Sequence, residues 1–335
     1  MTMPPAYYIT TPIYYVNDSP HIGHAYTSLS CDVLARFMRA DGYKVMFLTG
    51  TDEHGQKVEK SAKESGVPPQ EFVDIVSKKF IELGETMNFS NNDFIRTTEN
   101  RHINSCKELW KRISKNNAPG TSDSNIYLGK YSGWYSVRDE AFYAEKELVK
   151  KSTSQTYVAP TGAPVEWVEE PSYFFRLSAW QEPLLKFYEE NPHFIAPATR
   201  RNEVLSFVSS GLQDLSISRT SFSWGVQVPG DESHIMYVWL DALTNYITAT
   251  GFPDEKEDKW KQFWPASLHM VGKDILRFHT VYWPAFLMAA GLEPPKRIYA
   301  HGWWTNEGQK ISKSFGNVID PRVIVERYGI DAVRY

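Results

Sequence analysis

The sequence predicts an α/β protein built on a parallel sheet, and two observations carry this prediction. Short apolar runs rich in β-branched and aromatic residues alternate with longer segments of helical periodicity, over residues 7–48 and again over 268–302. Between them, residues 126–228 contain many short strand and turn patterns. We therefore expect a Rossmann-like parallel sheet with helices on both faces, interrupted by an inserted mixed α+β connective domain.

Composition narrows the class of protein. The chain has 335 residues, enough for two or three domains, and a formal net charge of −4, which gives no global attraction to nucleic acid. Its longest apolar runs are too short to cross a bilayer, and its start lacks the pattern of a secretory signal. Two cysteines fit a reducing compartment. We expect a cytoplasmic monomer with no membrane or DNA partner.

The first strand pattern leads into a helix that we expect to end at Gly42. His21-Ile22-Gly23-His24 lies at this strand-to-helix junction, where the unpaired N–H groups and positive dipole of a helix start favour phosphate. Gly23 lets a nucleotide approach the backbone, and both imidazoles can donate hydrogen bonds. The alternative is that His21 and His24 are ordinary surface histidines. The apolar face predicted for the helix comprises Leu29, Val33, Leu34, Phe37 and Met38.

A second strand, residues 44–48, leads into the segment 49–55, which carries Asp52 and His54. Strand, helix and strand form a βαβ unit, so the two strands should be parallel and a ligand should bind beyond their carboxyl ends. Asp52 then either caps the helix that follows or faces a substrate cation, and the pattern does not decide between them. Residues 69–117 look helical.

The rest of the chain divides at changes of pattern. The turn-rich stretch 116–124 indicates a boundary, and two helical segments, 180–190 and 202–212, follow within the insert. The sheet pattern resumes at 234–243, with later strands at 268–271 and 298–302. We expect four parts: the first half of the parallel-sheet domain (1–118), the insert (119–228), the second half of that domain (229–301), and a cationic loop with the start of a helical region (302–335).

The combination of His21-Ile22-Gly23-His24 with Lys310-Ile311-Ser312-Lys313-Ser314 resembles the class I aminoacyl-tRNA synthetases, whose two signature motifs are usually written HIGH and KMSKS. Ile311 replaces the usual methionine and keeps an apolar side chain. Residues 49–55, 214–219 and 237–242 are similar to the methionyl-tRNA synthetases among them.

The resemblance implies that the protein activates L-methionine with ATP, with Mg²⁺ assisting, and transfers it from methionyl-adenylate to tRNA(Met). It implies catalytic roles for His21, His24, Lys310 and Lys313. It places ATP against these four residues and Gly23, Gly272, Asp274 and Trp304. It places methionine against Ile13, Tyr15, Asp52, Trp239, Ala242, Leu243, Tyr246, Ile275, His279 and Trp283. Aromatic rings suit the polarizable thioether, and the Tyr246 hydroxyl is a candidate donor to its sulfur.

The insert departs from the zinc-binding members of this family. They carry Cys-x-x-Cys pairs where this sequence has Ser136 and Asp139, and the insert contains no cysteine. A thiolate site is therefore excluded there, and we expect the zinc-free form with no metal site. A helix opens at Asp331 close to the end of the sequence, so we also expect no anticodon-binding domain and poor charging of tRNA.

Three other functions are compatible with parts of this pattern. Another class I synthetase is one, although the insert is short for an editing domain and the pocket lacks the zinc ligands that cysteine recognition would use. A small-molecule nucleotidylyltransferase would share the histidine motif but not the lysine-rich loop. A non-catalytic RNA-binding protein on the same fold would not need both motifs.

Overall fold

The computed structural model describes residues 4–16, 19–138, 141–143, 145–150, 156–302, 305–306, 309–310 and 319–335. Its centre is a seven-stranded sheet in the order β10-β16-β15-β1-β3-β2, with β4 also paired to β3, and every pairing is parallel. The strands are β1 (Ala6–Thr10), β2 (Tyr14–Tyr15), β3 (Lys44–Asp52), β4 (Asp93–Arg96), β10 (Ile195–Ala196), β15 (Leu268–Gly272) and β16 (Ile298–His301). The predicted parallel sheet is confirmed.

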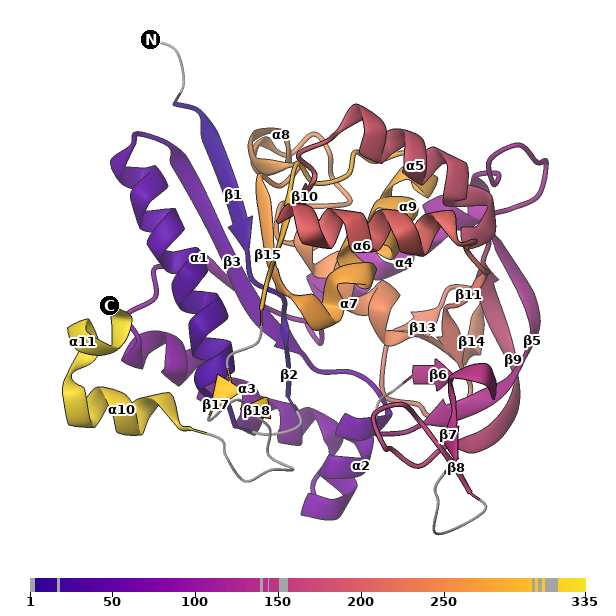
Figure 1. Ribbon diagram of the computed structural model, residues 1–335, viewed down its shortest axis with the longest axis horizontal. Coiled ribbons are helices and arrows are strands. Elements are labelled where there is room, and N and C mark those ends of the chain that lie inside the picture. Colours follow the sequence, from indigo (N-terminus) through magenta and orange to yellow (C-terminus); the bar gives the residue numbers. More distant parts are fainter. Residues whose placement is uncertain are drawn as a thin grey trace.

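Helices cover both faces of this sheet because side chains alternate along β1 and β3. Ile9 and Phe47 pack with α1 (Ile22–Ala40) on one face. Tyr8 and Met46 belong to the main core on the other face, which α4 (Asn100–Lys115), α7 (Val238–Thr248) and α9 (Trp283–Ala289) build. Figure 1 shows α1 on the left of the sheet and α4, α7 and α9 on the right.

The buried face of α1 differs from the predicted one. Its buried residues include Cys31, Asp32 and Ala35, whereas Val33 and Phe37 are 54% and 62% exposed. Small residues allow the helix to lie close along β1 and β3. Apolar periodicity predicted the helix correctly, and Leu34 and Met38 pack against the core, but Val33 and Phe37 do not.

The segment 69–117 is not wholly helical. It contains α3 (Pro69–Thr86), the short strand β4 and α4, and α2 (Gln56–Ser65) precedes it. Four residues are too few for a strand pattern to stand out from the helical periodicity around it, and the pairing with β3 decides its conformation.

The insert is built on the long antiparallel pair β5 (Ile126–Ser136) and β9 (Glu166–Phe175), which curves down the right side of Figure 1. This sheet continues through β6 (Ala141–Tyr143) and β11 (Leu215–Ser216). The other elements are η1 (Glu145–Glu147), β7 (Val149–Lys150), β8 (Tyr157–Val158), η2 (Leu177–Trp180), α5 (Gln181–Glu190) and α6 (Ala198–Ser209). Ser136 is buried in β5, and Asp139 lies outside the described residues. The absence of zinc stays a prediction.

Strand pairing crosses the proposed domain boundaries twice. β10, within the insert, adds the edge strand to the parallel sheet beside β16. β14 (Asp231–Met236), expected to resume that sheet, instead pairs antiparallel with β12 (Ser218–Arg219) and β13 (Gln227–Val228). Residues 238–243, predicted as part of the same strand pattern, instead belong to α7. A short apolar segment that is buried on all sides has the same sequence pattern whether it forms a strand or a helix. This explains why the helix was predicted as a strand.

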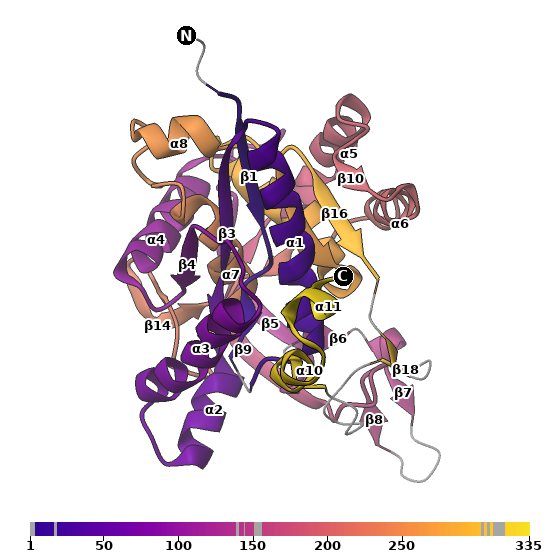
Figure 2. The same cartoon turned by 90° about the vertical axis from the view of Figure 1, so that its left-hand side faces the viewer.

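The end of the chain packs back onto α1 and α3. After η3 (Lys273–Ile275), the π-helical turn η4 (Phe278–Tyr282), α9 and β16, the chain forms the hairpin of β17 (Thr305–Asn306) and β18 (Gln309–Lys310), then α10 (Pro321–Tyr328) and α11 (Ile330–Arg334). Figure 2 shows α10 and α11 beside α1 and α3. The remaining helix, α8 (Asp258–Phe263), leads into β15. Within the described ranges, no helix has the length and apolar character of a membrane span.

A buried carboxylate joins α11 to α1. Asp32, fully buried, accepts hydrogen bonds from Arg36 Nε at 2.8 Å, Arg334 Nη2 at 2.6 Å, and the backbone N and hydroxyl of Ser90 at 2.6 and 2.7 Å. Arg334 also donates to the Met87 carbonyl at 2.6 Å. This charged network ties the last helix to the helix that carries the histidine motif.

Replacing Arg334 should therefore weaken the fold. We expect Arg334→Met to lower the free energy of unfolding by about 1–3 kcal/mol, because a buried carboxylate loses a charged donor. Denaturant unfolding followed by circular dichroism measures this, with Arg327→Met, at an exposed position of α10, as the control. Equal effects of the two substitutions would contradict a role for the network.

Candidate active site

The carboxyl ends of the parallel strands surround one cavity of about 530 Å³. The loops after β1, β3, β15 and β16 contribute to its wall, together with the start of α1 and one face of α7. Its lining includes these predicted residues: Ile13, Tyr15, His21, Gly23, His24, Asp52, Trp239, Ala242, Leu243, Tyr246, Gly272, Asp274, Ile275 and His279. Residues from four distant parts of the sequence thus meet at the sheet edge where parallel folds bind ligands.

The two histidines of the motif cap α1. Nδ1 of His21 accepts the backbone N–H of Gly23 at 3.0 Å, and Nδ1 of His24 accepts the backbone N–H of His21 at 3.0 Å. Since each Nδ1 accepts a hydrogen bond, the neutral rings carry their own proton on Nε2. The backbone bonds of the helix start therefore orient both rings and make Nε2–H their donor.

Gly23 has a steric role besides the one expected. A Cβ atom at this position would lie 2.9 Å from Cε1 and 3.0 Å from Nδ1 of His21. Any side chain here would push the His21 ring out of its cap. At Gly272, a Cβ would lie 2.6 Å from Oδ1 of Asp274, so this glycine makes room for the carboxylate next to the cavity.

Asp52 does not cap the helix that follows it. It is the last residue of β3, only 6% exposed, and lines the cavity, whereas Gly55 is the N-cap of α2. Of the two alternatives, the capping one is wrong. A buried carboxylate at the wall of an apolar cavity is suited to bind a cation.

The floor of the cavity is a hydrogen-bonded pair of rings. Nδ1 of His279 lies 3.0 Å from the Ile275 carbonyl, so this nitrogen carries the proton, and Nε2 accepts the hydroxyl of Tyr246 at 2.7 Å. Trp283 was predicted to line the cavity, but it does not. It is fully buried and lies behind Tyr246, with ring centroids 6.0 Å apart. Trp283 follows His279 by four residues, which would place both on one face of an α-helix, but the π-helical repeat of η4 turns Trp283 away from that face.

Several lining residues were missed by the sequence analysis. They are Pro12, Tyr14, Tyr26, Thr27, Lys57, Val238, Asn245, His301 and Gly302. His301 could have been found, because it ends the last strand of the sheet; its Nε2 lies 2.9 Å from Oγ1 of Thr27. Nζ of Lys57 lies 5.5 Å from the centre of the Tyr15 ring. The sequence gives no sign that would distinguish Lys57 from the other charged residues of α2.

Three predicted residues cannot be placed in the cavity. Trp304 and Lys313 lie outside the described residues, and for Lys310 the structure describes only the backbone, in β18. Their roles stay predictions from the sequence.

The buried histidines beneath the cavity are held neutral. Burial lowers the pKa of His279 to about 4, although its hydrogen bond to the Ile275 carbonyl opposes the shift. Burial also lowers the pKa of His269, whose ring stacks on Tyr246, well below the usual value of 6.5. An uncharged floor suits an apolar ligand group.

These shifts predict a pH dependence of stability. Between pH 6.5 and about 4, the unfolded chain binds protons at these histidines that the folded chain does not, so the free energy of unfolding should fall as the pH falls. His279→Gln should reduce this dependence, measured by denaturant unfolding across that window. His193→Gln, at an exposed position, should leave it unchanged. The same dependence in both variants would refute the assignment.

Comparison with known proteins agrees with this geometry. The family model described as tRNA synthetases class I (M) matches residues 7–335. Methionine--tRNA ligases of Rickettsia typhi and Rickettsia felis are 62% and 63% identical over 329 residues, covering 98% of this chain and 62% of each relative. The chain thus spans less than two thirds of their length.

Solved structures give the same result. Mycobacterium tuberculosis methionyl-tRNA synthetase in complex with methionyl-adenylate superposes with a TM-score of 0.93 at 54% identity, covering 99% of this chain and 64% of that one. Its apo form gives a TM-score of 0.82 at 51% identity, covering 100% of this chain and 61% of that one. On the match over residues 7–335, this chain belongs to the class I tRNA synthetases, in their methionine family (M).

Proposed function

We propose that this chain activates L-methionine with ATP, forming methionyl-adenylate and pyrophosphate, and transfers methionine to the 3′ end of tRNA(Met). One observation carries the proposal: a single cavity joins the histidine-capped start of α1 to a buried carboxylate and to an uncharged pocket of aromatic and aliphatic side chains. The names of the relatives, and the adenylate in the more similar Mycobacterium structure, support it.

The proposed first step needs no general base. The carboxylate of methionine is ionised at neutral pH and attacks the α-phosphorus of ATP, and pyrophosphate leaves. Rate enhancement then comes from positioning the reactants and from stabilising charge on the phosphates. Nε2–H of His21 and of His24 are preoriented donors for phosphate oxygens, because their Nδ1 atoms are held by the backbone.

Methionine would bind along the opposite wall. Asp52 would receive its ammonium group, and the side chain would extend toward Ala242, Leu243 and the floor formed by Tyr246 and His279. In the described geometry the Tyr246 proton is donated to His279, so a thioether that accepts this proton must share or replace that bond. Neutral rings here favour a polarizable apolar group over a charged one.

The remaining partners follow the same proposal. Gly272 and Asp274 would border the adenosine, with Trp304, Lys310 and Lys313 completing the site from the loop after β16. Asp52 and Asp274 are the carboxylates among the cavity-lining residues, so Mg²⁺ would bind chiefly to the phosphates and to water rather than in a protein cage. We propose further that the chain acts as a cytoplasmic monomer that holds no zinc.

The deciding experiment is ATP–pyrophosphate exchange with each amino acid in turn. Exchange that depends on methionine, with leucine, isoleucine, valine and cysteine far weaker, supports the proposal. Exchange with another amino acid would assign the chain to a different specificity. No exchange with any of them would favour a non-catalytic protein on this fold. Aminoacylation of tRNA(Met), measured on the same preparation, tests the transfer step separately.

The role of Asp52 gives a sharper prediction. Asp52→Asn should lower kcat/KM for methionine in exchange by about 10- to 100-fold, because a charged hydrogen bond to the ammonium is lost. The KM for ATP should change little. Asp254→Asn, at an exposed position, is the control and should behave as wild type. If Asp52→Asn keeps the wild-type kcat/KM for methionine, Asp52 does not bind the ammonium.

A further inference from the structure

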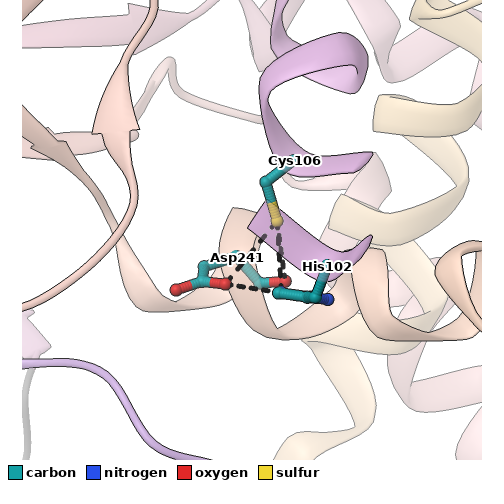
Figure 3. Close-up of side chains that lie close together, drawn as sticks. All are labelled: His102, Cys106 and Asp241. Atoms are coloured by element: carbon teal, nitrogen blue, oxygen red, sulfur yellow. Dashed lines mark hydrogen bonds and ion pairs between the residues drawn. The ribbon is translucent and has the colours of Figure 1, made fainter. Parts of the chain in front are cut away.

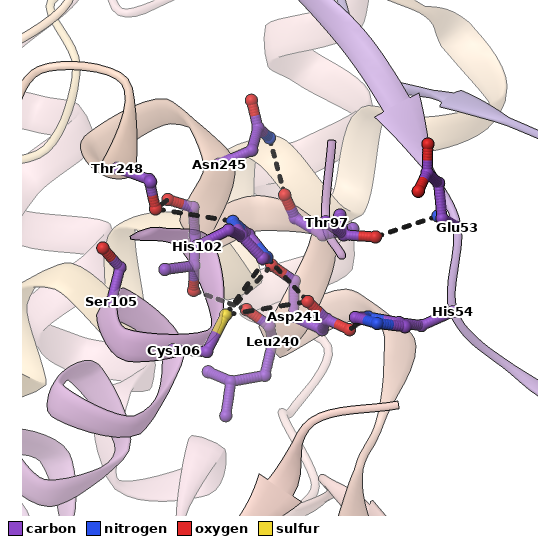
Figure 4. Close-up of polar contacts among 12 residues, drawn as sticks. Glu53, His54, Thr97, His102, Ser105, Cys106, Leu240, Asp241, Asn245 and Thr248 are labelled. Atoms are coloured by element: carbon purple, nitrogen blue, oxygen red, sulfur yellow. Dashed lines mark hydrogen bonds and ion pairs between the residues drawn. The ribbon is translucent and has the colours of Figure 1, made fainter. Parts of the chain in front are cut away.

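A fully buried carboxylate, Asp241, lies in the first turn of α7 between two histidines. Its Oδ2 lies 2.7 Å from Nδ1 of His54, and its Oδ1 lies 2.7 Å from Nε2 of His102 (Figures 3 and 4). Burial raises the pKa of this carboxyl, but the two imidazoles outweigh burial, and the net pKa lies well below the usual range. Asp241 is therefore an ionised carboxylate, and both imidazole rings donate hydrogen bonds to it.

Cys106 completes the cluster from α4, one turn after His102 (Figure 3). Its Sγ lies 3.2 Å from Nε2 of His102 and 3.6 Å from Oδ1 of Asp241. These three side chains could together hold a metal ion. Burial raises the pKa of the Cys106 thiol, however, and each of the three ligand atoms already has a hydrogen-bond partner within the cluster. The network is satisfied without an ion.

The cluster joins two walls of the cavity that are far apart in the sequence. On one side, His54 follows Asp52 by two residues in the loop after β3, and the neighbouring Glu53 accepts hydrogen bonds from Arg96 at 2.7 and 3.0 Å. On the other side, Asp241 immediately precedes Ala242 and Leu243, which line the cavity. The hydrogen bond between His54 and Asp241 is thus a direct link between the strand end that carries Asp52 and the helix that lines the side-chain pocket (Figure 4).

We propose that Asp241 is a positioning residue, with His54 as its partner: it sets the separation between Asp52 and the wall on α7. The inference rests on the proposed function, because methionine must place its ammonium and its side chain against these two walls at once. His102 anchors the carboxylate to α4, and Asp241 touches no substrate group itself.

The physical reason is preorganisation. A ligand that bridges two subsites gains affinity only if their separation already matches its length; otherwise part of the binding energy is used to bring the walls together. Without the link, each subsite can still bind its own half of the ligand. The loss should therefore appear for methionine and not for a ligand that uses one subsite alone.

The test compares methionine with 4-(methylthio)butanoate, which keeps the thioether and the carboxylate but lacks the ammonium group. Calorimetric titration measures both affinities in wild type, Asp241→Asn, His54→Ala and His54→Asn. We expect His54→Ala and Asp241→Asn to weaken the binding of methionine about 10- to 100-fold and the binding of the analogue by less than about twofold. His54→Asn should restore most of the affinity, because its amide nitrogen can replace Nδ1 as donor.

Asp32→Asn is the matched control, since it alters another fully buried carboxylate with several donors, on α1. It should lower the melting temperature and leave both affinities unchanged. If His54→Ala weakens the binding of methionine and of the analogue equally, or weakens neither, the positioning role is overturned and the proposed function is unaffected. A tightly held metal ion in wild type that Cys106→Ala removes would also overturn the positioning role. Failure of the wild type to bind methionine would overturn the proposed function together with this inference.

Discussion

The candidate site depends on the parallel pairing of β1 with β3 on one side and with β15 on the other. In parallel strands all carboxyl ends lie at the same edge, so the loops that follow them must converge there. The register Thr10↔Leu48 and Thr10↔His269 places the end of β1 beside β3 and β15, and both neighbours continue beyond it toward the cavity. Without this register, the histidine motif, Asp52 and Asp274 would not share a cavity.

The start of α1 combines a structural and a chemical role in the same rings. A serine or aspartate would be the usual cap, yet here histidine nitrogens accept the backbone N–H groups. Each imidazole has two nitrogens, so it can cap the helix with one and offer a donor with the other. This arrangement couples the orientation of the donors to the stability of the helix, and it makes Gly23 necessary because a side chain there would displace His21.

The interior behind the cavity contains several buried polar and charged side chains. His54, His102 and Asp241 form one buried cluster, and His269 stacks on Tyr246 behind the floor that Tyr246 and His279 form. Buried polar groups cost free energy unless their hydrogen bonds are made, and once made they allow few alternative packings. A core of this kind fixes the walls of the cavity more narrowly than aliphatic packing alone would, which suits selection of a ligand by shape and length.

The sequence by itself determined the parallel α/β class and the positions of the motif histidines. Local periodicity, with the rule that parallel sheets bind ligands at one edge, also placed Asp52 near those histidines, whereas most other residues of the cavity wall were predicted from the resemblance to the methionyl-tRNA synthetases. The tertiary structure decided what depends on contacts between distant segments. Examples are the pairing of β14 outside the main sheet, the position of Trp283 behind Tyr246, and the exposure of Val33 and Phe37.

The contact between His54 and Asp241 belongs to this second group. The two residues are 187 positions apart, and nothing near either one indicates a partner. Local patterns report which side chains an element has and how they repeat. Only the packing of α7 and α4 against the loop after β3 decides that these two meet, because that packing is a property of the whole core.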